Sequence, residues 1–222
     1  MRDGATRRFD LIVFDWDGTL ADSTAPIVFA MKEACRDLGI PVPDDIAARY
    51  VIGLGLADAM KFVAPALAAT RFPELGARFR HHYLAREADI PLFAGARELL
   101  GELEAAGFLL AVATGKTRVG LARMLENFGL ERAFHATRCA DEGFPKPHPD
   151  MLLHLMDRLD VKPRATLMIG DTTHDLDLAR NAGAHAVAVT YGAHSADELA
   201  PLSPLAAVQS VPELREWLKL HA

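Results

Sequence analysis

The 222-residue sequence has little of what marks several protein classes. It has only two cysteines, Cys35 and Cys139, which lie far apart and form no metal-type pair. Cysteines used this sparingly favour free thiols in a reducing compartment over a disulfide. The apolar run near the N-terminus is too short for a signal peptide or a membrane span. We therefore expect a cytoplasmic protein that does not enter a membrane.

An excess of basic residues is also missing. The 24 lysines and arginines are outnumbered by 30 aspartates and glutamates, which gives a formal net charge of −6. This balance gives no reason to expect binding to nucleic acid or to an anionic membrane. Half of the residues are hydrophobic, so the chain can bury a full core. No sustained heptad repeat is present, and the oligomeric state stays open.

Short apolar runs bounded by turn residues recur along the chain and predict buried parallel strands. The runs cover residues 9–14, 108–113, 134–139, 165–169 and 185–190, with a weaker one at 206–210. Apolar residues at helical spacing lie between the later runs, at residues 96–106, 117–128, 149–159 and 176–182. This alternation predicts an α/β fold with a doubly wound parallel sheet.

The first crossover breaks the alternation. A simple βαβ unit needs only about 30 residues, whereas the segment between the first two predicted strands is far longer and has the pattern of several helices. Ser23 or Thr24 is a candidate cap for the first of them, and Asp44 and Asp45 mark the start of the second. Further helices are predicted at residues 56–67 and 74–87. We expect a helical cap domain at residues 22–89, inserted into a core domain formed by residues 1–21 and 90–222.

Asp15-Trp16-Asp17-Gly18-Thr19 follows the first apolar run directly. This places two carboxylates two residues apart at the end of a buried strand. One carboxylate can attack an electrophile while the other donates or accepts a proton. Carboxylate nucleophiles carry phosphoryl groups as aspartyl-phosphates. Taken alone, the two aspartates have an ordinary alternative, because aspartates after strands often sit in turns or cap helices.

Three later segments fall at the predicted carboxyl ends of strands or just before a helix: Thr114-Gly115-Lys116, Pro145-Lys146-Pro147, and the stretch from Gly170 to Asp175. In an open α/β sheet the carboxyl ends of the strands border the ligand crevice. Thr114 offers a hydroxyl, Gly115 an unobstructed N–H and Lys146 a compact cation, which are groups that bind phosphoryl oxygens. Outside this context, Lys146 would be an ordinary surface lysine.

Carboxylates in the first and last segments supply the hard oxygen ligands that Mg²⁺ prefers. Asp15 together with Asp171 meets this demand, and Asp175 offers a further oxygen. The cation would offset the repulsion between an anionic nucleophile and an anionic substrate. Asp175 has an alternative role, because it is also placed to cap the helix that follows.

These four segments, in this order, resemble the signatures of the haloacid dehalogenase-like (HAD) hydrolase superfamily, and the resemblance covers essentially the whole chain. The helical insert is similar to the C1 cap of phosphoglycolate-phosphatase-like members. Asn181-Ala182-Gly183-Ala184, which leads into a predicted strand, also looks like that subgroup. The resemblance implies a Rossmann-like core with an inserted cap.

The resemblance also implies the roles of the carboxylates. Asp15 would be the nucleophile, and Asp17 the general acid for the leaving oxygen and then the base for water. Asp15, the backbone carbonyl of Asp17 and Asp171 would ligate Mg²⁺, with Asp175 acting through a second layer or a water.

The phosphoryl oxygens would be bound by Thr114 and Lys146. Backbone N–H groups near Trp16, Asp17 and Gly115 would complete the anion pocket. The Trp16 side chain itself is interpreted as a packing residue.

Two further features are open to more than one interpretation. The Gly53-Leu54-Gly55 turn, with Arg49 before it, can face the phosphate pocket and contact the leaving group, but a plain turn between helices is an equal alternative. His174 lies inside the last segment, and we interpret it as a loop-facing side chain without a catalytic role.

The sequence therefore predicts a Mg²⁺-dependent phosphatase that hydrolyses a small phosphorylated metabolite, with phosphoglycolate as the first candidate by analogy. A phosphomutase of the same superfamily and a non-catalytic regulatory protein with this fold remain alternatives. A haloacid dehalogenase is disfavoured, because phosphatase-type members keep the second carboxylate, here Asp17, and dehalogenation leaves Asp171 unexplained.

Overall fold

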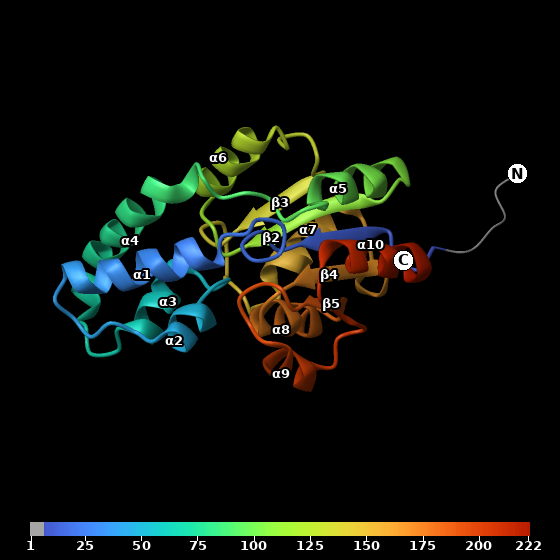
Figure 1. The fold of residues 1–222 in the computed structure, drawn as a ribbon. Helices are drawn as coiled ribbons and strands as arrows, with labels where there is room; N and C mark the ends of the chain where they lie inside the picture. The colour runs from blue at the N-terminus through green and yellow to red at the C-terminus, as the bar shows by residue number, and fades with distance from the viewer. Residues whose placement is uncertain (1–6) are drawn as a thin grey trace, which may run out of the picture.

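A six-stranded parallel sheet forms the centre of the computed structural model, which describes residues 7–222 (Figure 1). The strands lie in the order β3-β2-β1-β4-β5-β6, and every neighbouring pair is parallel. Their bounds are β1 Leu11–Phe14, β2 Leu109–Thr114, β3 Ala136–Cys139, β4 Thr166–Gly170, β5 His185–Val189 and β6 Ala207–Val208. Each falls on a predicted apolar run, and the predicted doubly wound sheet is confirmed.

Helices cover both faces of the sheet, because side chains along a strand alternate between the two faces. Ile12 and Phe14 belong to the larger apolar cluster, whereas Leu11 and Val13 belong to the cluster on the opposite face. The first face is covered by α5 (Ala96–Ala105), α6 (Arg118–Phe128) and α10 (Val211–His221). The second is covered by α7 (Asp150–Leu159) and α8 (Thr173–Asn181), and α9 (Ala196–Leu199) packs on α8. Short 3-10 turns lie at η1 Ala69–Arg71, η2 Pro163–Ala165 and η3 Ala200–Leu202.

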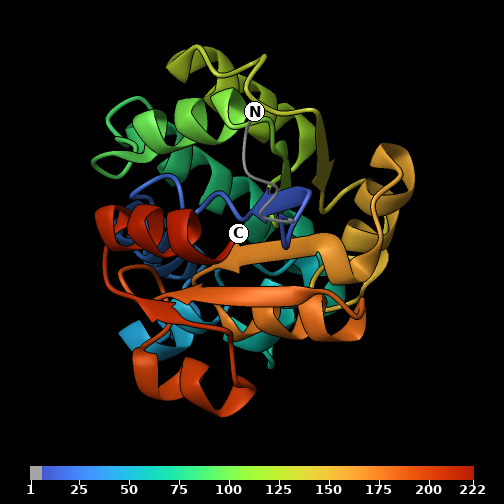
Figure 2. The ribbon, with the colours of Figure 1, turned by 90° about the vertical axis from the view of Figure 1, so that its right-hand side faces the viewer.

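The C-terminal helix α10, red in Figure 2, packs against α5 and β6. None of the helices within residues 7–222 is both long and apolar enough to cross a membrane.

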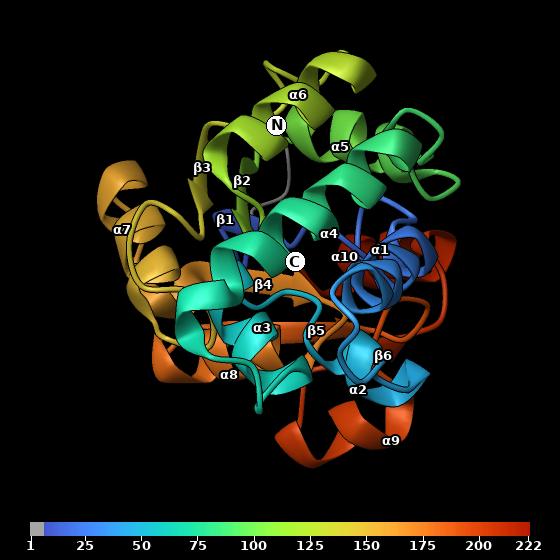
Figure 3. The same cartoon turned by 90° about the vertical axis from the view of Figure 1, so that its left-hand side faces the viewer.

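Four helices lie between β1 and α5: α1 Thr24–Asp37, α2 Asp45–Tyr50, α3 Leu56–Val63 and α4 Phe72–Glu87. We call this segment the helical insert. It has an apolar cluster of its own, to which α1 contributes Met31 and Cys35, α3 contributes Met60 and α4 contributes Leu75. Figure 3 shows these helices in front of the sheet, on the side where the strands end. The predicted helix at 56–67 is shorter than expected and ends at Val63.

Helix α8 begins three residues earlier than the apolar pattern indicates. Thr172 is its N-cap, and its side-chain oxygen accepts from the Asp175 N–H while the Asp175 carboxylate accepts from the Thr172 N–H. This reciprocal capping box extends the helix through polar residues that apolar spacing cannot detect. The interpretation of His174 as a loop-facing side chain is wrong, because His174 lies in the first turn of α8 and is only 4% exposed.

Candidate active site

The sheet topology brings the first and last predicted segments together. β1 and β4 are neighbours, with Phe14 opposite Ile169, and Asp15 and Asp171 directly follow these two strands. The strand order reverses between β1 and β4, because β2 lies on the other side of β1. Such a switch point opens the crevice in which doubly wound proteins bind ligands.

Lys146 is a buried cation between two carboxylates. Its Nζ donates to Asp15 Oδ1 and to Asp175 Oδ1, each at 2.6 Å, and the side chain is only 1% exposed. Burial lowers the pKa of Lys146, but the charges of Asp15 and Asp175 more than offset this, so its pKa is raised above the ordinary value. Lys146 therefore keeps its positive charge inside the protein, where it fixes one oxygen of Asp15.

Asp171 is held by two donors from separate loops. Its Oδ1 accepts from the Thr19 hydroxyl at 2.8 Å, and its Oδ2 accepts from the Ala193 N–H at 2.7 Å. Gly18 passes so close that a Cβ there would lie 2.2 Å from Asp171 Oδ2, and its φ of +82° is one that side chains disfavour. The Asp-Gly-Thr order thus has a local reason: glycine makes room for Asp171, and threonine bonds to it.

The buried carboxylates form a cluster suited to a divalent cation. Asp15, Asp171 and Asp175 each offer an oxygen within 4.8 Å of the others, and Asp15 Oδ2 is buried without a hydrogen-bond partner among residues 7–222. Burial raises the pKa of Asp15 to about 7, and Asp175 adds to the rise while Lys146 opposes it. Burial likewise raises the pKa of Asp171 well above its ordinary value. Three carboxylates around one lysine repel one another when they are ionised, and a bound cation would offset that repulsion.

Asp175 has less freedom than the other two aspartates. Its Oδ1 accepts from Lys146, and its Oδ2 accepts from both the N–H and the hydroxyl of Thr172, at 3.0 and 2.6 Å. Within the described residues Asp175 accepts three hydrogen bonds, against two at Asp171 and one at Asp15, so Asp175 is better suited to orient Lys146 than to ligate an ion.

Asp17 lines the cavity where the core meets the helical insert. Its Oδ1 accepts from the Ser23 hydroxyl at 2.6 Å and lies 3.1 Å from Lys116 Nζ. Lys116 also donates to the Tyr83 hydroxyl on α4, at 2.8 Å. Burial lowers the pKa of Lys116, but Asp17 and Tyr83 outweigh it, and the pKa is raised. The second carboxylate is therefore tied to both the core and the insert.

Three residues around Asp17 were not expected at the site from the sequence: Ser23, Lys116 and Tyr83. Ser23 was expected only as a helix cap, yet it occupies the N-cap position of α1 without capping, since its hydroxyl bonds to Asp17. The position of Lys116 directly after a buried strand was a usable signal, because charged residues there face the crevice. Tyr83 gave no signal, since its contact depends on how the insert packs.

Thr114 and Gly115 end β2 beside β1. Thr114 is fully buried, and its hydroxyl oxygen accepts from the Lys116 N–H at 3.2 Å. A Cβ at Gly115 would lie 2.7 Å from the carbonyl oxygens of Gly53 and Leu54, so the turn of the insert rests directly on this glycine. The structure thus places the Gly53-Leu54-Gly55 turn over the second segment.

Trp16 and Arg49 lie outside this network of side-chain contacts. Trp16 is fully buried and packs against Phe128, with ring centroids 6.2 Å apart. Its side chain therefore packs in the core, which leaves only its backbone to serve the site. Arg49 is exposed on α2 and does not line the cavity beside Asp17, so the structure does not bring it to the other predicted residues.

Two buried histidines join the core to the insert. His174 Nε2 lies 2.7 Å and His194 Nε2 lies 3.2 Å from the same backbone carbonyl oxygen, that of Tyr50 on α2. His194 Nδ1 accepts from the Thr173 N–H at 3.1 Å, which leaves its Nε2–H to donate. Burial lowers the pKa of both histidines. Neutral imidazoles from α8 and from the loop after β5 thus join the core to α2.

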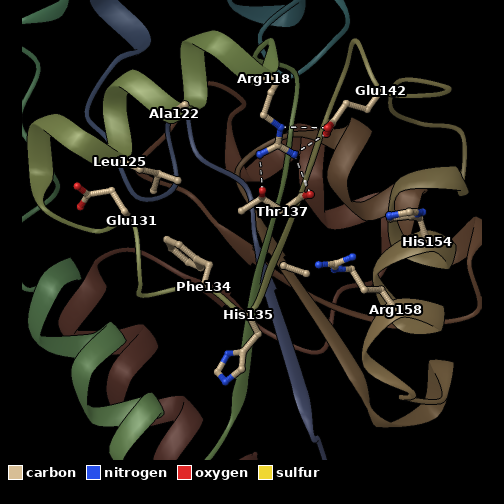
Figure 4. Close-up of a pocket in the computed structure, with 11 residues that line it drawn as sticks. Arg118, Ala122, Leu125, Glu131, Phe134, His135, Thr137, Glu142, His154 and Arg158 are labelled. Carbon is tan, nitrogen blue, oxygen red and sulfur yellow. Dashed lines mark hydrogen bonds and ion pairs between the residues drawn. The ribbon is translucent and has the colours of Figure 1, made fainter.

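A cavity of about 310 Å³ opens between the helical insert and the core. Asp17, Gly115 and Lys116 form its floor, and residues of α1 and α4 with the 51–54 turn form its walls. A larger cavity of about 520 Å³ lies beside β3, between α6 and α7 (Figure 4). There Arg118 donates to Glu142 Oε2 at 2.6 Å and to the Thr137 carbonyl at 2.9 Å. None of the predicted site residues lines the larger cavity, so the candidate active site is the smaller one.

The fold and the clustered aspartates define a class, and comparison with known proteins agrees. The family model of haloacid dehalogenase-like hydrolases matches residues 12–189, so the chain belongs to that family. It is 39% identical over 212 residues to a Dickeya dadantii protein named "Probable phosphatase IndB", with 92% of this chain and 91% of the relative covered. It is 32% identical over 223 residues to the phosphoglycolate phosphatase of Vibrio vulnificus, covering 96% and 97%. These relatives confirm the expectation of a phosphatase-type hydrolase of the phosphoglycolate-phosphatase-like group.

The relatives and structural neighbours are not uniform in their names. The tyrosine-protein kinase PtkA of Mycobacterium tuberculosis is 34% identical over 212 residues, with 94% of this chain and 72% of the kinase covered. A crystal structure of a hydrolase from Pseudomonas syringae superposes with a TM-score of 0.88 at 25% identity, covering 95% of this chain and 98% of that one. The fold is therefore shared across the family, and the site must decide the activity.

Proposed function

We propose that this protein is a Mg²⁺-dependent phosphomonoesterase that hydrolyses a small phosphorylated metabolite through a phosphorylated Asp15. The observation that carries the proposal is the state of the Asp15 carboxylate. Lys146 holds its Oδ1 at 2.6 Å, while its Oδ2 is buried without a partner in the described chain. One oxygen is thus fixed, and the other is available to an electrophile.

In the first step, Asp15 Oδ2 attacks phosphorus, and the bond from phosphorus to the leaving oxygen breaks. Asp17, at the floor of the cavity, donates a proton to that oxygen, so the product leaves as a neutral alcohol. In the second step, Asp17 takes a proton from water, whose oxygen attacks phosphorus as the bond to Asp15 breaks. Inorganic phosphate leaves, and both aspartates return to their starting state.

Other groups stabilise the transferred phosphoryl group. Lys146, the Thr114 hydroxyl and the backbone N–H groups near Trp16 and Gly115 are its proposed ligands. Asp15, the Asp17 carbonyl and Asp171 would hold Mg²⁺, with Asp175 acting through Lys146 or a water. When bound, Mg²⁺ supplies positive charge that lets an anionic phosphate approach Asp15.

The helical insert is proposed to act as a cap over this site, with the division at residues 22–89 given above. Its support is the contact of Tyr83 with Lys116 and of the 53–55 turn with Gly115. Closure of such a cap excludes bulk water and selects the leaving group.

We also propose that the reaction takes place in the cytoplasm. This is in keeping with Cys35 and Cys139, which are both buried free thiols.

The direct test is phosphate release from a generic aryl phosphate and from phosphoglycolate, with and without Mg²⁺. Asp15→Asn should abolish turnover in the presence of Mg²⁺, while the fold, monitored by circular dichroism, is retained. Turnover by Asp15→Asn at the wild-type rate would remove the proposed nucleophile. A phosphomutase would instead yield an isomeric phosphate ester with little free phosphate, and a regulatory protein would yield neither.

A further inference from the structure

The cavity between the insert and the core has few polar groups free to bind a substrate. Its walls are apolar: Ile27 and Met31 come from α1, Ile52 from the turn, and Phe79 and Leu84 from α4. On the core side, Val119 of α6 is 70% exposed at the mouth of the cavity. A leaving group that enters the cavity therefore meets mostly hydrocarbon.

Two of the cations that line the cavity, the buried Lys116 and the partly exposed Arg123, are already paired. Lys116 lies 3.1 Å from Asp17 Oδ1, and Arg123 Nη2 donates to Glu87 Oε1 at 3.0 Å. Arg80 is the one lining cation without an ion pair among residues 7–222, and it is exposed. An exposed cation contributes little to binding an anion, because water screens the interaction.

A carboxylate on the leaving group would thus lose its hydration without gaining a dedicated partner, and it would lie near Asp17 and Glu87. A hydrocarbon leaving group would instead replace water against apolar walls. The cavity, at about 310 Å³, is at the small end for small-molecule sites, which are roughly 300–1,000 Å³.

We infer that the preferred substrates are phosphate monoesters of compact apolar alcohols, such as an aryl-methyl or branched alkyl alcohol, rather than of hydroxy acids. The inference rests on the proposed phosphomonoesterase function and names its substrate class. It places leaving-group selection in Leu84 and Val119 at the rim and in the apolar wall behind them.

The test compares benzyl phosphate with 2-phosphoglycolate under identical Mg²⁺ conditions. Both esters release a primary alcohol, so their intrinsic reactivities are similar and the contrast reports on binding. We expect kcat/KM for benzyl phosphate to be roughly 10- to 100-fold higher, the effect of burying one ring. A higher kcat/KM for 2-phosphoglycolate, lost in Arg80→Gln, would overturn the inference while leaving the proposed function intact. Phosphate release from neither ester would contradict the proposed function itself.

A matched pair of variants links the preference to the cavity. Leu84 and Leu153 are both 47% exposed, but only Leu84 lines the cavity, whereas Leu153 lies on α7. Leu84→Ser should lower the ratio of kcat/KM for benzyl phosphate to kcat/KM for 2-phosphoglycolate about threefold to tenfold. Leu153→Ser should leave this ratio unchanged. Equal effects of the two variants on benzyl phosphate, or an unchanged preference in Leu84→Ser, would show that the cavity wall does not select the leaving group.

Discussion

Lys116 Nζ lies 3.1 Å from Asp17 Oδ1, and the same nitrogen donates to the hydroxyl of Tyr83 in the helical insert. This relationship joins the proposed acid–base residue of the core to a helix of the insert through one buried cation. The packing of α4 against the core therefore helps to position the carboxylate that we propose to handle the proton.

Removal of the Lys116 charge should impair the chemical step. In Lys116→Met, Asp17 loses the cation that orients it, and we expect kcat to fall about 10- to 100-fold, which is less than the roughly 10²- to 10⁴-fold that a general acid–base group itself contributes. Steady-state kinetics with a generic phosphate ester would measure this. Lys61→Met, which removes an exposed lysine paired with Asp58 on α3, is the control and should leave kcat unchanged. An unchanged kcat in Lys116→Met would show that the contact with Asp17 is structural only.

Ser23 should matter for catalysis rather than for helix stability. Its hydroxyl bonds to Asp17 and does not cap α1, whereas the hydroxyl of Ser210 caps α10 by accepting from the Glu213 N–H. Ser23→Ala should lower kcat severalfold, and the loss of its buried hydrogen bond to Asp17 should also cost about 1–3 kcal/mol of unfolding free energy. Ser210→Ala should leave kcat unchanged and cost about 1 kcal/mol of stability. Steady-state kinetics and denaturant unfolding on both variants measure these two effects. An unchanged kcat in Ser23→Ala, or a lowered kcat in Ser210→Ala, would contradict the prediction.

Tyr83 should make the stability depend on pH above 10. Burial raises the pKa of Tyr83 to about 12, with a further rise from Asp17, against an ordinary value of 10.0. Between pH 10 and 12 the unfolded chain loses this proton while the folded protein keeps it, so the free energy of unfolding falls as the pH rises. The contribution is on the order of 2–3 kcal/mol across the window.

The Tyr83→Phe variant isolates this effect. The difference in free energy of unfolding between the wild type and the variant should be constant below pH 10 and should shift in favour of the variant above it. Denaturant unfolding at several pH values measures this difference. A difference that stays constant up to pH 12 would contradict the buried environment described for Tyr83.

Metal binding should stabilise the protein through Asp171. Three buried carboxylates around one lysine repel one another when they are ionised, so Mg²⁺ bound between them should raise the melting temperature of the wild type. Asp171→Asn should weaken Mg²⁺ binding at least 10-fold and abolish most of the shift. Asp177→Asn, on the same side of the sheet but outside the cluster, should keep the shift. A full shift in Asp171→Asn would mean that the ion binds elsewhere.

Much of the core was predictable because its information is local. Each strand was predicted by an apolar run in the sequence, and the alternation of strands and helices determines which ends of the strands lie together. This is why Asp15, Lys146 and Asp171, which are distant in sequence, were expected at one edge of the sheet. Their resemblance to one family's ordered segments supplied the roles.

The misses came from contacts that cross the boundary between core and insert. His174 looked like a loop residue because a capping box, not apolar spacing, begins α8, and its partner is the carbonyl of Tyr50 in another segment. Tyr83 reaches Lys116 only through the packing of α4. Arg49 was predicted to contact substrate because it precedes the 53–55 turn. In the structure Arg49 is exposed to solvent. Local sequence patterns do not show which residues from distant segments become neighbours in the folded protein.

The most direct test of the proposed mechanism is chemical trapping of the phosphorylated residue. Borohydride reduces an aspartyl-phosphate to homoserine, so protein quenched during turnover and treated in this way can be sequenced by mass spectrometry. The mechanism predicts homoserine at position 15, dependent on substrate and on Mg²⁺, and absent in Asp15→Asn. Rapid phosphate release with aspartate intact at position 15, or with homoserine at another position, would contradict it.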